Sequence, residues 1–236
     1  MKLLYFDDFK LGVLKGDNTV VDVSAVVRDI PHTGPGDLMN GLIERFAAYR
    51  AKLEAAAASG QGVALASVRI RPPLPKPANI DCMAVNYMED GTRSAPAPIN
   101  AFNKSASAII GNGDTMVLPD VPASIFEGEA EMAVIIGKRA TNVSAANAMD
   151  YVFGYTNFID GSARGLPAGG FFHMKSRDTF APIGPWITTA DEIKDPQKLQ
   201  IRLWNNGTLY QNFNTDRKST RLNSSHIQKS RMPSSA

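Results

Sequence analysis

The 236 residues include 44% hydrophobic and 20% charged side chains, a composition typical of a folded globular protein and not of a disordered one. The formal net charge of +2 depends on residues 217–236, which hold five of the 25 Lys and Arg and no acid, so we predict no binding of nucleic acid. No apolar run approaches the roughly 20 residues of a membrane helix, and the first apolar segment meets Asp7 and Asp8 instead of a cleavage site, so no membrane anchor or export signal is predicted.

The first 75 residues are predicted to form a small N-terminal α/β domain. Short apolar segments alternate with turn signals over residues 2–23, a pattern that predicts a meander of strands. From Asp37, a candidate N-cap, apolar residues recur at helical spacing as far as Leu53, which predicts one helix of about 20 residues. The proline-rich residues 72–78 cannot supply regular backbone donors, so we place a domain boundary near residue 75.

Residues 76–216 are predicted to be mainly β within an α+β fold. Short apolar segments bounded by Gly, Pro and Asp occur at 80–85, 108–110, 116–118, 132–136, 152–159, 183–187 and 199–204. Ser144 is expected to cap one short helix that reaches Tyr151. Many short strands without long alternating helices favour a sandwich, roll or barrel over a doubly wound sheet. Cys82, the single cysteine, is interpreted as a buried inert thiol, and it favours a reducing cytoplasmic location.

Residues 217–236 differ in character from the rest of the chain. They contain six serines and five basic residues, and they show no periodic apolar face. We interpret them as a non-native disordered tail that follows a truncation point, which would leave the 76–216 domain incomplete at its C-terminus. His226 is therefore left out of the candidate site.

Three glutamates alternate along the expected strand at 126–136. Side chains of a strand alternate between its faces, so Glu127, Glu129 and Glu131 project to the same side. Neighbouring carboxylates about 7 Å apart repel one another, and a hard divalent ion such as Mg²⁺, Mn²⁺ or Ca²⁺ would relieve the repulsion. A solvent-facing edge strand, in which charges discourage pairing with other chains, explains the same spacing equally well. A further acid, Asp160, ends another apolar strand and favours the metal site.

Several ordered segments closely resemble the fumarylacetoacetate hydrolase family over about residues 80–216. The segments are EAEMAVIIG at 129–137, GYT at 154–156, DGSAR at 160–164, KSRDTF at 175–180 and PIGP at 182–185, preceded by VNY at 85–87, FNKS at 102–105 and IIG at 109–111. The order and spacing of these segments are more specific than any one of them.

The resemblance implies a mixed β-sandwich roll, a homodimer and a central divalent metal, usually Mg²⁺ or Mn²⁺. It implies metal ligands at Glu129, Glu131 and Asp160, and substrates that are small 2-oxo acids. Lys175 and Arg164 would lie beside the metal and contact substrate oxygens, and Tyr87 is a further candidate for substrate binding.

The chain departs from the family pattern at three places. The water-activating histidine that many family hydrolases carry shortly after Asn86 and Tyr87 is absent, and Glu89 or Asp90 would replace it only if burial raised the proton affinity of the carboxylate. An acid after Arg164 is replaced by glycine, within residues 165–170, which we interpret as a mobile loop and not as a phosphate cradle. The family continues beyond Asp216 with a substrate loop and closing strands.

The remaining polar candidates receive weaker assignments. His32 is expected at the surface, and His173 is expected to pack beside aromatic residues, although it would be able to approach the site. Lys104 and Arg93 are interpreted as solvated residues that can also steer an anionic substrate. Glu127 either supports the two ligand glutamates or faces water.

The predicted function is metal-dependent hydrolysis of a carbon–carbon bond in a β-diketo or acylpyruvate-like 2-oxo acid through a metal-stabilised enolate, as in the catabolism of aromatic compounds. An isomerase or decarboxylase of 2-oxo dicarboxylic acids is the first alternative, because these reactions need no activated water. A binding protein with a structural ion is the second. The products formed from 2-oxo acids with Mg²⁺ present distinguish the three: two acids, carbon dioxide, or no product despite binding.

Overall fold

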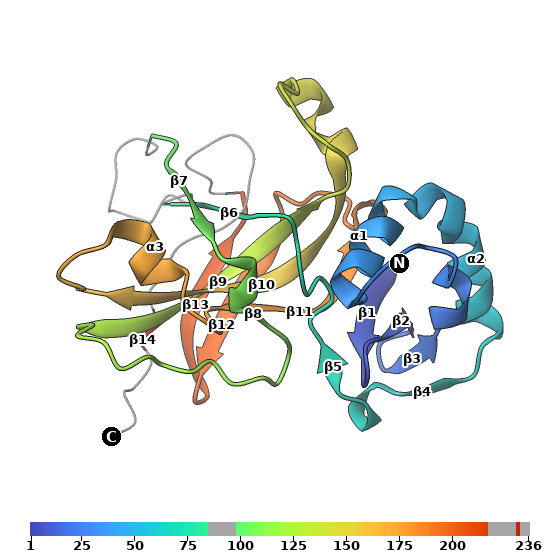
Figure 1. Ribbon diagram of the computed structural model, residues 1–236, viewed down its shortest axis with the longest axis horizontal. Helices are drawn as coiled ribbons and strands as arrows, with labels where there is room; N and C mark the ends of the chain where they lie inside the picture. Colours follow the sequence, from blue (N-terminus) through green and yellow to red (C-terminus); the bar gives the residue numbers. More distant parts are fainter. Residues whose placement is uncertain (85–97, 217–229, 232–236) are drawn as a thin grey trace.

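The structure is a computed structural model, and it describes residues 1–84, 98–216 and 230–231. One large sheet runs through the molecule with the strand order β14-β9-β10-β11-β1-β2-β3-β4 (Figure 1). These strands span Lys2–Phe6 (β1), Lys10–Lys15 (β2), Thr19–Asp22 (β3), Gly62–Ala64 (β4), Ile125–Ile136 (β9), Val152–Arg164 (β10), Ala181–Thr189 (β11) and Ser230–Arg231 (β14). Short strands β5 (Ile70–Arg71) and β8 (Ile109–Ile110) join β1 and β11, and the β8 pairing is parallel.

The N-terminal strands form the predicted meander and continue the sheet of the following region. β1 pairs with β11, with Leu3 opposite Ile187, so the boundary predicted near residue 75 does not interrupt the sheet. Apolar side chains of β1 to β3 are buried on both faces of the sheet, and the larger core cluster includes Leu3, Tyr5 and Leu11. Two short 3-10 helices, η1 (Ser24–Val27) and η2 (Leu65–Ser67), complete this part.

The expected single helix is wrong, because the segment forms two helices. α1 spans Pro35–Glu44 and α2 spans Phe46–Ser59, with a break at Arg45, whose φ of −107° and ψ of 12° are not helical. The predicted N-cap is also wrong, since Gly34 precedes α1 and Pro35 occupies its first turn, where a missing backbone N–H costs nothing. Asp37 lies within the first turn of α1 and accepts a hydrogen bond from Thr33. Apolar residues of both helices pack into the main core.

Small elements surround β9 and β10. β6 (Ile80–Met83) and β7 (Ala101–Lys104) form a two-stranded sheet. α3 (Gly170–Lys175) lies beside this small sheet and contacts both β7 and β10 (Figure 1). A second two-stranded sheet, β12 (Gln200–Asn205) with β13 (Thr208–Asn214), contacts β9 through β12. The helix predicted after Ser144 forms as the 3-10 helix η4 (Ala145–Tyr151), and η3 (Ala106–Ala108) and η5 (Ala190–Glu192) are also 3-10 turns. Residues 116–118 form no strand.

The predicted mainly β fold is confirmed. No helix in the described part of the chain is long and apolar enough to span a membrane. Of residues 217–236 the structure describes only the two that form β14, which pairs with Gly128 and Glu127 of β9, so the interpretation of this segment stays a prediction.

Gly161 marks a close approach between β10 and the chain after α3. Its N–H donates to the Phe180 carbonyl at 3.0 Å, and an added Cβ would lie 2.9 Å from the Cβ and Cγ atoms of Phe180. Gly161→Ala is therefore expected to lower the free energy of unfolding by about 1–3 kcal/mol, because the buried ring must move. Chemical denaturation measures this loss.

The matched control is Gly34→Ala, where an added Cβ meets no atom within 4 Å. The poorer N-cap and the reduced entropy of the unfolded chain offset each other there, so a change within about 0.5 kcal/mol is expected. Equal denaturation midpoints for the two variants would show that the contact with Phe180 is not restrictive.

Candidate metal centre

Strands β9 and β10 place acids from two parts of the sequence on one face of the sheet. Their antiparallel register sets Glu129 directly opposite Asp160, with Glu131 opposite Phe158 and Glu127 opposite Ser162. Residues that face each other across antiparallel strands project from the same face, as do residues two apart on one strand. The alternation along one strand and the register between the two strands therefore bring the carboxylates together.

The three predicted metal ligands converge. One carboxylate oxygen from each of Glu129, Glu131 and Asp160 lies within 4.8 Å of the other two. Oxygen ligands of Mg²⁺, Mn²⁺ or Ca²⁺ lie about 2.0–2.6 Å from the ion, so ligands on opposite sides are about 4–5 Å apart and this oxygen set fits one such ion. The residues are 1%, 4% and 0% exposed, so the alternative of a solvent-facing edge strand is wrong.

Three cationic side chains surround the acids. Lys104 Nζ lies 2.6 Å from Asp160 Oδ1, and Lys175 Nζ lies 3.2 Å from Glu129 Oε2 and also contacts Asp160. Arg164 Nε lies 2.7 Å from Glu127 Oε2, and the same guanidinium also forms an ion pair with Glu129. Among the described residues, these four carboxylates and three cations carry a formal net charge of −1. Buried charges are tolerated only when they are paired, and pairing here leaves the cluster suited to an added cation.

The structure corrects one sequence interpretation of these cations and extends another. Lys104 is not solvated, because its side chain is fully buried. Arg164 is 30% exposed, so it forms the solvent side of the cluster, and Lys175 lies beneath it with almost no exposure. Tyr87, Glu89, Asp90 and Arg93 lie outside the described residues, and their predicted roles are not described by the structure.

Burial and charge shift two pKa values near the acids. Burial raises the pKa of the Cys82 thiol, and the negative charges of Glu131 and Asp160 raise it further, which agrees with an inert neutral thiol. Burial alone would lower the pKa of Arg164, but the charges of Glu129 and Glu127 outweigh it and raise this pKa above its usual value. Both groups therefore keep one protonation state at neutral pH.

Sequence reasoning missed three residues that hold the cluster in place. Ser162 Oγ lies 3.4 Å from Glu129 Oε1, and Gln211 Oε1 accepts a 2.7 Å hydrogen bond from the backbone N–H of Ala130, between the two ligand glutamates. The Phe102 ring lies 5.3 Å from Lys175 Nζ and stacks on Phe171. Phe102 had a sequence signal, since it shares a strand face with Lys104, but Gln211 had none.

Two of the three histidines, His32 and His173, lie in the described part of the chain. His32 is exposed, as predicted. His173 has the predicted aromatic neighbour, since its ring lies 6.3 Å from that of Phe172, but its side chain is exposed and not buried in the packing. The exposure of His173 follows from helical geometry. Phe171 and Lys175 are one turn apart and face the sheet, so His173, midway between them, lies on the outer side of α3. The predicted mobility of residues 165–170 stays a prediction, and Gly170 begins α3.

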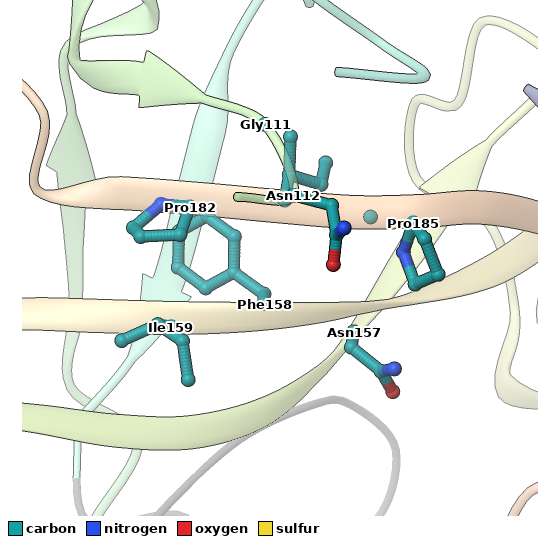
Figure 2. A pocket seen from close by; sticks show the side chains of 9 residues that line it. Gly111, Asn112, Asn157, Phe158, Ile159, Pro182 and Pro185 are labelled. Carbon is teal, nitrogen blue, oxygen red and sulfur yellow. The ribbon is translucent and has the colours of Figure 1, made fainter. Parts of the chain in front are cut away.

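A cavity of about 210 Å³ lies beside the sheet bulge between β10 and β11. Figure 2 shows the Asn112 side chain between Pro182 and Pro185 on its wall. Three residues of β10, Asn157, Phe158 and Ile159, line this cavity, but Glu129, Glu131 and Asp160 are not among its lining residues. The cavity is thus separate from the candidate metal centre.

Comparisons with known proteins agree with the resemblance seen in the sequence. Residues 79–222 match the family described as Fumarylacetoacetate (FAA) hydrolase C-terminal. The chain is 32% identical over 231 residues to a maleylpyruvate hydrolase of Aquipseudomonas alcaligenes, which covers 91% of this chain and 79% of that protein. It is also 32% identical to the oxaloacetate tautomerase YisK of Bacillus subtilis, with 85% of this chain and 73% of that protein covered.

Solved structures give the same family. The maleylpyruvate hydrolase from Sphingobium sp. SYK-6, in complex with manganese (II) ion and pyruvate, is similar with a TM-score of 0.82 and 37% identity over 93% of this chain and 78% of that chain. A 5-carboxymethyl-2-hydroxymuconate delta-isomerase from Mycobacterium smegmatis is similar with a TM-score of 0.69 and 26% identity, covering 93% of this chain and 78% of that one. The sequence match, the fold and the acids of β9 and β10 agree, and this chain belongs to the fumarylacetoacetate hydrolase family of enzymes.

Proposed function

We propose that this chain is a divalent-metal-dependent hydrolase that cleaves a carbon–carbon bond in a β-diketo or acylpyruvate-like 2-oxo acid. The observation that carries the proposal is the convergence of Glu129, Glu131 and Asp160, buried and within 4.8 Å of one another. These residues would hold Mg²⁺, or Mn²⁺ or Ca²⁺ in its place. When bound, the ion supplies Lewis-acid polarisation of a substrate carbonyl.

The cationic residues have separate tasks in this proposal. The Lys175 ammonium is fixed between Glu129 and Asp160, where it stabilises negative charge that develops on a substrate oxygen. Arg164 lies at the exposed side of the cluster and suits a substrate carboxylate, because its planar guanidinium can donate two parallel hydrogen bonds. Tyr87 is a further proposed contact, and Glu89 or Asp90 is the proposed base for water.

The reaction type rests on two kinds of support. Hydrolysis is favoured by the likeness to two proteins named maleylpyruvate hydrolase, at 32% and 37% identity. Isomerisation or decarboxylation of a 2-oxo dicarboxylic acid is the second candidate, because the sequence after Tyr87 lacks the family histidine and relatives include oxaloacetate tautomerases. We further propose that the enzyme acts as a homodimer in the cytoplasm, in the catabolism of aromatic compounds.

Side-by-side assays of acetylpyruvate and oxaloacetate with Mg²⁺ separate the candidates. Acetylpyruvate is expected to give pyruvate and acetate in equal amounts, and a chelator such as EDTA is expected to stop the reaction. Carbon dioxide released from oxaloacetate would identify a decarboxylase, and loss of its enol absorbance without carbon dioxide would identify a tautomerase. Oxalate binding that requires Mg²⁺, without any product from either acid, would contradict an enzymatic role.

A further inference from the structure

We propose that Lys104 is a positioning residue that holds Asp160 and the end of α3 in place and makes the metal-loaded centre positive enough to bind an anion. The inference rests on the proposed metal centre. The sequence pattern predicted that Lys104 is solvated. In the proposed role, Lys104 affects the affinity for the cation and the affinity for the substrate differently.

All donors of the Lys104 ammonium are used within the protein. Its Nζ lies 2.6 Å from Asp160 Oδ1 and 3.0 Å from the Gly161 carbonyl, and it also donates to the carbonyl of Lys175. An ammonium group has three N–H donors, and each of the three has a protein acceptor. With a fully buried side chain and no donor left over, Lys104 acts on a substrate only through Asp160 and Lys175.

The placement of Lys104 follows from the pattern of β7. Phe102 and Lys104 are buried while Ala101 and Asn103 are exposed, so the ring and the ammonium project from the same face of the strand, where Lys104 reaches Asp160 of β10 and the end of α3. The Lys104 side chain thereby joins three elements that are distant in sequence, since Asp160 and Lys175 follow it by 56 and 71 residues.

The hydrogen bond to Lys175 fixes the end of a helix. Lys175 is the last residue of α3, and the final carbonyls of a helix have no partner within the helix. Lys104 supplies the missing donor, while the Lys175 ammonium reaches Asp160 and Glu129. One buried ammonium therefore sets both the orientation of the Asp160 carboxylate and the backbone from which the second ammonium extends.

Charge gives Lys104 a separate effect on cations and anions. The four carboxylates and three cations that the structure describes here sum to a formal charge of −1, so a divalent cation changes this sum to +1. Without Lys104 the sum would be two negative charges, and the loaded centre would be neutral. Loss of Lys104 loosens Asp160 but also adds one unit of negative charge, so the two effects on cation binding offset each other. Anion binding is expected to weaken, whereas a general loss of structure weakens both.

The test is Lys104→Met, which keeps the length of the side chain and removes its charge and donors. Titration of the full chain with Mn²⁺ is expected to give a Kd at most about threefold higher than that of the wild type. The Kd of oxalate for the Mn²⁺-saturated protein is expected to rise about tenfold or more. Lys194→Met, at an exposed lysine, is the matched control and is expected to leave both constants unchanged.

Lys104→Gln, which keeps donors but not the charge, provides a second variant if the methionine variant does not fold. It is expected to show the same separation of the two constants. Oxalate binding as in wild type, or a parallel loss of Mn²⁺ and oxalate binding, would overturn the role of Lys104 while leaving the metal centre intact. A wild-type protein that binds no Mn²⁺ would instead overturn the metal centre and the role of Lys104 with it.

Discussion

Glu131→Gln is expected to lower metal-dependent turnover by about three orders of magnitude or more. The glutamine keeps the shape of the side chain but removes the negative charge from one of three oxygens that lie within 4.8 Å of one another. A hard divalent ion binds a neutral amide oxygen less strongly than a carboxylate. A bound ion that acts as a Lewis acid lowers the activation barrier by several kcal/mol, so weaker ion binding lowers the rate strongly.

Initial rates with 2-oxo acid substrates and saturating Mg²⁺, together with Mn²⁺ titration, measure this effect. Glu44→Gln is the control, because Glu44 is exposed and lies outside the cluster. Circular dichroism distinguishes loss of the centre from loss of the fold, which the isosteric change is expected to leave intact. Wild-type rates in the glutamine variant would show that Glu131 holds no catalytic ion.

The shared face of the glutamates could be predicted from local periodicity, because alternation along a strand needs only neighbouring residues. Glu127, Glu129 and Glu131 lie on one face as expected, and their burial resolves the alternative of an exposed edge. The approach of Asp160 depends on the register between β9 and β10, which periodicity cannot provide. The sequence named Asp160 as a further acid at the end of another strand, and the resemblance to a family implied that it is a ligand together with Glu129 and Glu131.

The position of Lys104 shows why long-range pairing limits sequence reasoning. A lysine in a polar segment is usually solvated, and burial is tolerated here because Asp160 and two carbonyls accept its donors. Gln211 is similar, since it lies 81 residues from Ala130, and their hydrogen bond depends on how the β12–β13 sheet packs against β9. The break between α1 and α2 involves Arg45 alone, and helix propensity is too weak a signal to reveal a one-residue interruption.

Lys175→Met is expected to lower kcat by about two to three orders of magnitude while Mn²⁺ binding is retained or strengthened. The ammonium is held 3.2 Å from Glu129 Oε2, in contact with Asp160, and 5.3 Å from the Phe102 ring, so little reorganisation is needed when charge develops on the substrate. Arginine cannot replace it, because a planar fork does not fit the space of a compact ammonium.

The comparison of kcat with Mn²⁺ affinity distinguishes this role from a structural one. Lys198→Met, with a side chain 78% exposed, is the matched control and is expected to retain wild-type values of both. If Lys175 only balanced charge, its loss would change metal affinity and leave kcat of the saturated enzyme within about threefold of wild type. A large fall in kcat with metal affinity preserved would therefore place its effect in the transition state, since the bound cation alone would then be insufficient for turnover.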